Sequence, residues 1–409
     1  NKLKNVETVD LKKSIEVTTG QNLDWFFKQW VYEPGFPEYD VSWTYNQRNK
    51  LLSLHVKQVQ DLKTTSLFKM PINVLIDNGT VEEHVIWVED LDSVFKMHTD
   101  KRPRMVVFNS GLKVPSNLKM QKSVSDLKYQ LINAPNVLDR IWAAQQLSKK
   151  KGRKIVEYAL LESAKEDSFW AVRSEAYSSL GKLKTKANQE DFQWIKNNEK
   201  DNRVKRSFIR SLRHQLNDDD VSSFLEDIII SDTSYYSIAD AIRILSVVDS
   251  SKAKDHVIKL LNTESHNDVI RKSALSYYGQ VKTMSNYNRL KELAQYGKFS
   301  WASRSTIIYE LSKYQKTRPK TYDYILSFFD DEDRFVRMAV IAQIGNYGNE
   351  SNYGLLDEMV EKDPVLSINS RRAKAKIQKR KNSVSKKSKT QTAEQLNKKI
   401  NAIKNILLD

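Results

Sequence analysis

The side chains best suited to chemistry are few and widely scattered along this 409-residue chain. Cysteine is absent, which excludes a thiolate nucleophile, a disulfide framework and a cysteine-ligated zinc. No two of the six histidines are four residues apart, so the H-E-x-x-H helix that presents two imidazoles to zinc is missing. Walker A, G-x-G-x-x-G and G-x-S-x-G patterns are missing as well. The sequence therefore predicts no catalytic residue, no cofactor-binding residue and no metal ligand within this chain.

Acidic side chains gather in three clusters, at positions where a strand or a helix is expected to begin or end. The clusters are Glu82-Glu83, Asp218-Asp219-Asp220 and Asp330-Asp331-Glu332-Asp333. Carboxylates at such boundaries stabilise helix N-termini, so we interpret them as structural rather than catalytic.

One basic position recurs about every 33 residues. The equivalent positions are Arg140, Arg173, Lys205, Ile238, Arg271, Arg304 and Arg337, and all of them except Ile238 are basic. Four of the arginines, Arg173, Arg271, Arg304 and Arg337, are candidates for contact with a substrate. The interpretation we favour is that this position ties one repeat to the next through an aspartate.

The same period organises the elements around that position. Apolar residues three and seven places after each repeat start mark one buried helix face, and a second apolar helical segment lies between successive starts. Glycine and proline together number 11 + 8 = 19, too few for a chain rich in tight turns. Residues 124–369 are therefore predicted to form about seven helical hairpins stacked as a HEAT-like α-solenoid.

A different pattern precedes the repeats. Between residues 37 and 115 apolar residues alternate with polar ones, and Asn78-Gly79 between two such runs indicates a hairpin with a type I′ turn. Six or seven short strands predict a small antiparallel β-sandwich, followed by a polar linker around residues 116–123. Residues 1–36 are predicted to form two short helices, which are too small to be a domain by themselves. They are predicted to be the end of a domain whose main part lies upstream. The predicted fold class is mainly α with a small all-β domain.

The net charge of +16 is concentrated at the C-terminal end. Residues 364–409 hold 13 Lys or Arg against two acids, which gives +11 and leaves 16 − 11 = +5 for the first 363 residues. Residues 370–409 are predicted to form a basic tail with a terminal amphipathic helix, whose apolar stripe is Leu396, Ile400, Ile403 and Leu407.

The same composition bears on partners. Because the tail has no interleaved aromatic residue for base stacking, nucleic acid is not expected as a partner. A protein partner through the solenoid or the tail stays open. No apolar run approaches the ~18 residues that span a bilayer, so no membrane span is expected. The compartment stays open between cytoplasm and periplasm or secretion.

A motif near the N-terminus resembles a known family. Gly20, Leu23, Phe26-Phe27, Gln29-Trp30 and Gly35-Phe36-Pro37 follow the pattern G-x-x-L-x-x-F-F-x-Q-W…G-x-P. With Val41-Ser42-Trp43 and Phe68–Val74 further on, this segment is similar to the zinc aminopeptidases of the aminopeptidase N type, a gluzincin metallopeptidase family. The resemblance covers the end of their catalytic domain and the β-sandwich that follows it.

The resemblance implies that zinc, its ligands and the catalytic glutamate lie in a catalytic domain upstream of Asp10, so none of them maps onto this chain. It implies a non-catalytic C-terminal region of an aminopeptidase that removes N-terminal residues from peptides, with the solenoid enclosing the active-site cleft. The parent protein would be the enzyme and would bind the peptide substrate, whereas this chain alone is expected to be inactive. The alternative is a non-catalytic scaffold or protein-interaction module with the same architecture.

Overall fold

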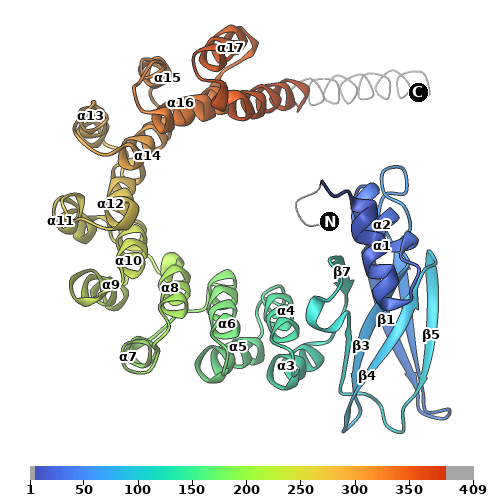
Figure 1. Cartoon of the computed structure of the whole chain (residues 1–409). Helices are drawn as coiled ribbons and strands as arrows, with labels where there is room; N and C mark the ends of the chain where they lie inside the picture. The colour runs from blue at the N-terminus through green and yellow to red at the C-terminus, as the bar shows by residue number, and fades with distance from the viewer. Residues whose placement is uncertain (1–4, 384–409) are drawn as a thin grey trace, which may run out of the picture. The chain divides into compact units, whose positions relative to one another are not determined.

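A computed structural model describes residues 5–383 of the chain (Figure 1). The protein is mainly helical with one small β domain, as the sequence predicts. Its internal contacts divide it into two compact units. The first unit comprises the residues up to 186 together with 199–211, and the second comprises 187–198 together with the residues from 212 onward.

Three short helical segments open the first unit: α1 (Thr8–Thr19), α2 (Asp24–Phe27) and the π-helix η1 (Lys28–Tyr32). A reciprocal capping box between Glu7 and Asp10 satisfies backbone donors at the start of α1. Gly20 ends that helix at a φ of 68°, a left-handed conformation that glycine adopts without steric cost. The two helices expected in this segment are thus present, and the second one continues as the π-helix.

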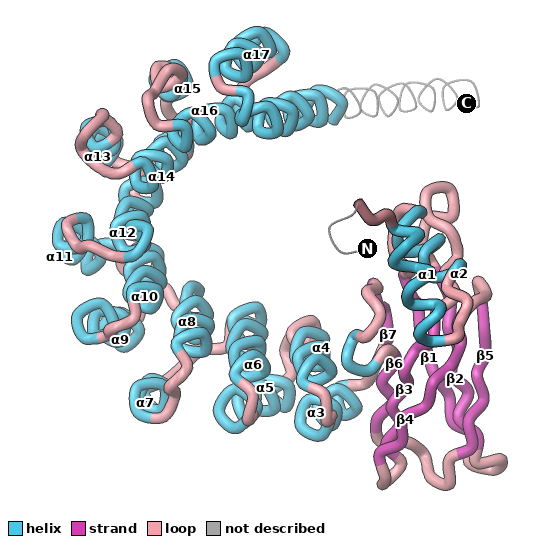
Figure 2. The backbone as a smooth tube through the Cα atoms, in the orientation of Figure 1, coloured by secondary structure: helices cyan, strands magenta, loops and turns pink. Residues whose placement is uncertain are grey.

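The β domain contains seven strands in two sheets (Figure 2). The first sheet has the order β5-β2-β1-β7, formed by β1 (Glu38–Asn46), β2 (Leu51–Gln58), β5 (Asp92–His98) and β7 (Asn117–Met120). The second has the order β4-β3-β6, formed by β3 (Met70–Asp77), β4 (Val81–Val88) and β6 (Met105–Phe108).

Alternate side chains from both sheets meet in one shared core. Leu52, Leu54 and Val56 of β2 are buried in the same apolar cluster as Ile72 and Val74 of β3. Residues two apart on a strand share a face, so each sheet turns its apolar face toward the other. The two sheets therefore pack as the layers of a sandwich.

Two details of the β domain differ from the sequence-based expectation. β7 pairs with β1 in parallel, so the domain is not wholly antiparallel, and β7 lies within the segment expected to be a linker. The Asn78-Gly79 hairpin is present between β3 and β4, but Asp77 pairs with Val81, which leaves a loop of three residues. Only Gly79 in that loop has a positive φ, of 119°, whereas a type I′ turn requires two such residues.

Helical hairpins follow the β domain. The α-helices of the first unit are α3 (Val124–Asn133), α4 (Val137–Leu147), α5 (Lys154–Glu166), α6 (Trp170–Leu183) and α8 (Asn202–Ser211). Within this unit α4 packs against α6, and α6 packs against α8.

The helices of the second unit form two rows. Its inner row contains α10 (Tyr235–Val248), α12 (Val269–Gln280), α14 (Trp301–Ser312) and α16 (Arg334–Tyr347), each packed against the next (Figure 2). On the other side lie α9 (Asp219–Ser231), α11 (Ser250–Leu261), α13 (Met284–Leu293), α15 (Thr321–Leu326) and α17 (Tyr353–Lys362). This unit also contains α7 (Gln189–Asn197).

The α-helices from α3 to α16 follow one another as seven pairs, the number that the repeat predicts. The apolar positions that define the repeat are buried, as Ala274, Ile307 and Val340 show on three successive inner helices. These residues make no contact with solvent because each inner helix is covered by its neighbours within the unit. Assignment of the repeats to the HEAT class stays a prediction.

The last described segment, residues 367–383, is also helical. We call it the C-terminal helix. It includes the first part of the predicted basic tail, and its Ala373 and Ile377 are buried. The predicted amphipathic helix with Leu396 and Leu407 lies outside the described residues. Within residues 5–383 no helix combines the length and the hydropathy needed to cross a bilayer.

Candidate functional site

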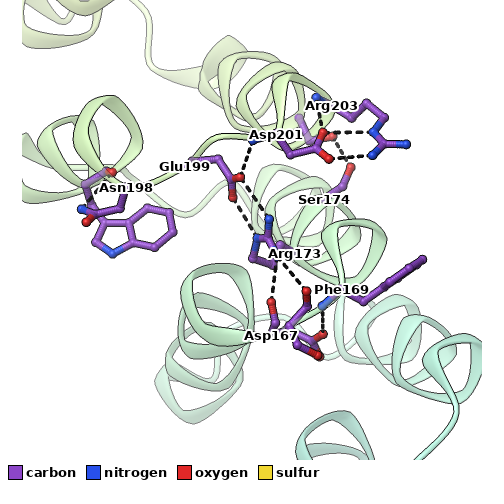
Figure 3. Close-up of polar contacts among 11 residues, drawn as sticks. Asp167, Phe169, Arg173, Ser174, Asn198, Glu199, Asp201 and Arg203 are labelled. Atoms are coloured by element: carbon purple, nitrogen blue, oxygen red, sulfur yellow. Dashed lines mark hydrogen bonds and ion pairs between the residues drawn. The ribbon is translucent and has the colours of Figure 1, made fainter.

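The recurring arginines lie near the start of the helices that follow each repeat boundary, and their guanidinium groups are held by other residues of the chain. Arg173 of α6 donates from Nε and Nη2 to the two carboxylate oxygens of Glu199, at 2.8 and 3.0 Å (Figure 3). Its Nη1 donates to the backbone carbonyl of Asp167 at 2.9 Å. The bond to Glu199 holds the pKa of Arg173 above its usual value.

Arg304 of α14 is the most enclosed of these arginines, with 1% of its surface exposed. Its Nη1 donates to Asp331 at 2.9 Å and to Asp333 at 2.8 Å, and its Nε donates to the carbonyl of Ala294 at 3.1 Å. Burial by itself would lower the pKa of Arg304, but the bonds to the two aspartates outweigh it and the pKa is raised. Its Nη2 also donates to the second carboxylate oxygen of Asp331, and the planar fork of arginine suits this bidentate pair, which a lysine would not reproduce.

The same arrangement recurs along the repeats. Arg140 binds both carboxylate oxygens of Asp167 at 2.7 and 3.1 Å, and Arg337 donates to Asp363 at 2.7 Å. In the four pairs that involve Arg140, Arg173, Arg304 and Arg337, the acid follows its arginine by 26 or 27 residues. Each of these arginines thus joins its own helix to the segment that precedes a later helix. We call this set of ion pairs the arginine ladder.

Arg271 of α12 departs from that pattern. It pairs at 2.6 Å with Asp268, three residues earlier, and its Nε donates to the carbonyl of Leu261 at 2.6 Å. Asp268 precedes the helix in a left-handed conformation with a φ of 54°. Its carboxylate also accepts a bond from Ser303 at 2.9 Å, so this position reaches the following repeat through α14.

The geometry of the arginine ladder agrees with the structural interpretation favoured from the sequence. Contact of Arg173, Arg271, Arg304 or Arg337 with a substrate stays a prediction. Glu199 is not expected from the sequence as the partner of Arg173, because the repeat pattern indicates an aspartate at this place. The recurrence of an acid 26 or 27 residues after the arginine is the signal that would have found it.

A second polar cluster, which no sequence motif indicates, lies where the β domain meets α3 and α4. The Lys122 ammonium is buried, lies 5.3 Å from the centre of the Trp142 ring, and donates to the carbonyl of Val106 at 2.5 Å and to Oε1 of Gln130. Burial lowers the pKa of Lys122 to about 7.

Asp139 of α4 completes this cluster, and both groups line a small pocket. Its carboxylate accepts bonds from the Ser110 hydroxyl at 2.6 Å and the Gly111 amide at 2.9 Å, while its carbonyl accepts from Gln130 at 2.8 Å. Burial raises the pKa of Asp139. These bonds fix the first helical hairpin to the β domain.

The motif that resembles aminopeptidases also has a clear structural role. Gln29 of η1 is buried, and its amide bonds to both the amide and the carbonyl of Lys69, at 2.5 and 3.2 Å. The Trp30 indole donates to the Met70 sulfur at 3.1 Å, and its ring lies 5.1 Å from that of Phe68. The motif therefore anchors the N-terminal helices to the start of β3.

Within residues 5–383 no three histidine or acidic side chains come close enough together to hold a metal ion. The described part of the chain comprises a β domain, a pair of short helices anchored on it, and helical hairpins joined by ion pairs.

Comparison with known proteins places this framework in an aminopeptidase-like architecture. The fold is similar to that of Legionella pneumophila aminopeptidase A, solved in complex with aspartic acid, with a TM-score of 0.62 and 15% sequence identity. The match covers 90% of this chain but 52% of that one, so the chain spans about half the length of the protein it matches. No family model matches the sequence, and no curated protein matches it. At this identity the likeness establishes the fold alone.

Proposed function

We propose that this chain is the C-terminal, non-catalytic region of a zinc-dependent aminopeptidase that removes N-terminal residues from peptides. The proposal is supported by the likeness to an aminopeptidase over 90% of the chain and by the share of that protein, about half, that the chain leaves unmatched. The anchored Gln29-Trp30 motif provides independent support from the sequence.

The observation that carries the proposal is the unburied surface of α1. This helix of 12 residues has no buried side chain, although Leu11 and Val17 are apolar and are 58% and 86% exposed. A helix this short is marginal in water without tertiary packing. We infer that its apolar side chains pack against a domain supplied by the rest of the parent protein.

In this proposal the zinc and its ligands belong to that other domain. Zinc bound there would polarise the scissile carbonyl and lower the pKa of a bound water. The residues of this chain have a supporting role: Gln29 and Trp30 hold the N-terminal helices on the β domain, and the arginine ladder holds the hairpins that border the cleft. Peptide substrates would bind to the parent protein.

The test compares the full protein from its native source with this 409-residue chain. We expect about one zinc per full-length molecule by elemental mass spectrometry, together with hydrolysis of aminoacyl-p-nitroanilides, while the isolated chain shows neither. A full-length product without zinc and without turnover would contradict the peptidase and favour the scaffold. Turnover by the isolated chain would contradict its assignment as non-catalytic.

A further inference from the structure

The C-terminal helix carries an unusual concentration of positive charge. Residues 364–383 contain seven lysines or arginines and no acid: Arg371, Arg372, Lys374, Lys376, Lys379, Arg380 and Lys381. They lie in the described part of the chain, on a helix whose position against α16 is set by side-chain contacts. This is an ordered surface rather than a stretch of solvated charge.

The helix is docked by its narrow apolar stripe. Ala373 and Ile377 are buried, and a Cβ placed on Gly345 of α16 would lie 3.0 Å from Cα of Ala373, so the two helices are in close contact. The Arg380 guanidinium donates to the carbonyls of Gly345 and Gly348 at the end of α16. A cation at a helix C-terminus is favoured by the helix dipole.

Some of the charge is used within the protein. Lys374 pairs with Asp357, and Lys381 pairs with Glu350 at 2.8 Å. Arg371, Arg372 and Lys379 are exposed. Together with Lys376, which is exposed and bonds to the Asn346 amide oxygen at 3.2 Å, they form what we call the cationic surface.

We propose that the cationic surface binds the phosphate backbone of a double-stranded nucleic acid without reading its sequence. Lys379 lies eight residues after Arg371, or about 12 Å further along a helix axis. A nucleic acid duplex carries one negative charge per ~1.7 Å and releases condensed counterions when cations bind it. Nucleic acid is not expected from the sequence because aromatic rings for base stacking are lacking, but contacts to phosphates require no base stacking.

An anionic membrane is a poorer fit to the same charge. A helix that lies in a membrane interface buries an apolar face among the lipids. Here Ala373 and Ile377 already pack on α16, and residues 364–383 contain no aromatic side chain. The charges that remain exposed suit a polymer of phosphates.

The experiment measures binding of the full chain to a fluorescein-labelled 20-base-pair DNA by fluorescence anisotropy, at salt concentrations from about 50 to about 200 mM. The variant Arg371→Gln/Arg372→Gln/Lys379→Gln removes three cations of the surface and no buried group. We expect it to bind at least tenfold more weakly than the unaltered chain near 100 mM salt. The slope of log K against log salt should fall by about 3, at ~0.9 per phosphate contact.

The matched control, Lys151→Gln/Arg153→Gln/Lys154→Gln, removes the same charge from exposed residues around the start of α5. It should keep the affinity and the salt slope of the unaltered chain. The proposal is overturned if the chain does not bind DNA at 50 mM salt, if both variants lose affinity equally, or if phosphatidylserine vesicles bind more tightly than DNA. None of these results depends on peptidase activity, so the proposed function stands or fails separately.

Discussion

Lys122 shows how one buried side chain couples the stability of the fold to pH. Its neighbours are the Val106 carbonyl, the Gln130 amide and the Trp142 ring, and the nearest carboxylates, on Asp126 and Asp139, only partly offset the effect of burial. Burial lowers the pKa of this ammonium to about 7 from the 10.5 of a free lysine. Between those pH values the unfolded chain holds a proton that the folded chain has lost, so the free energy of unfolding increases as pH rises.

We predict that the free energy of unfolding rises by about 2 kcal/mol between pH 7 and pH 9 because of Lys122 alone, since each unit of pKa difference corresponds to about 1.4 kcal/mol. The variant Lys122→Met should lose this rise, whatever its absolute stability. Urea unfolding at several pH values measures it. Lys101→Met, at an exposed position, should keep the pH dependence of the unaltered chain. An unchanged pH slope in Lys122→Met would contradict the lowered pKa.

At the scale of elements, the arginine ladder ties neighbouring hairpins together. Arg304 on α14 is held by Asp331 and Asp333, which precede α16. An ion pair of this kind contributes less than its geometry suggests, because burial removes the hydration of both charges. Removing one partner is far more costly, since it leaves the other charge buried without compensation.

Arg304→Met should therefore lower the free energy of unfolding by about 3–5 kcal/mol. The double variant Arg304→Met/Asp331→Asn should recover part of that loss, because it removes the uncompensated carboxylate. The control Arg289→Met, which breaks the exposed pair with Glu292 and a bond to Tyr278, should cost about 1 kcal/mol. Chemical unfolding of the three variants tests this. Equal losses for Arg304→Met and Arg289→Met would show that the ladder does not hold the hairpins.

At the scale of the whole molecule, the N-terminal helices divide into an anchored part and an unburied part. Phe27, the last residue of α2, is buried at 4% exposure, whereas Leu11 and Val17 of α1 are exposed to solvent. If α1 packs against another domain of the parent protein, its apolar side chains contribute nothing to the stability of the isolated chain. In that case they stabilise only the complete protein, in which the other domain covers them.

We predict that Leu11→Asp/Val17→Asp leaves the unfolding of the isolated chain unchanged and lowers the melting temperature of the full-length protein. Phe27→Ala should destabilise both, by about 3–5 kcal/mol, because it leaves a cavity in a buried position. Differential scanning fluorimetry of both proteins makes the comparison. A full-length protein that tolerates the double substitution would contradict a domain packed on α1.

The sequence by itself determined the fold class, most of the strands and the repeated hairpins, because these follow from local periodicity. Residues two apart share a face of a strand, and residues three or four apart share a face of a helix. Ala274, Ile307 and Val340 are buried as their spacing predicts. The regular spacing of the arginines is visible in the sequence in the same way, and it favours a structural role over contact with a substrate.

Only the tertiary structure decided which distant groups meet. Three contacts join residues that no local period connects. They are the pairing of Arg173 with Glu199, the parallel pairing of β7 with β1, and the burial of Lys122 between the β domain and α4. The C-terminal helix is the clearest case, because its Ala373 and Ile377 are buried and Ala373 lies against Gly345 of α16. Burial, charge compensation and pKa depend on what surrounds a group in space, and that environment is set by the packing of the whole chain.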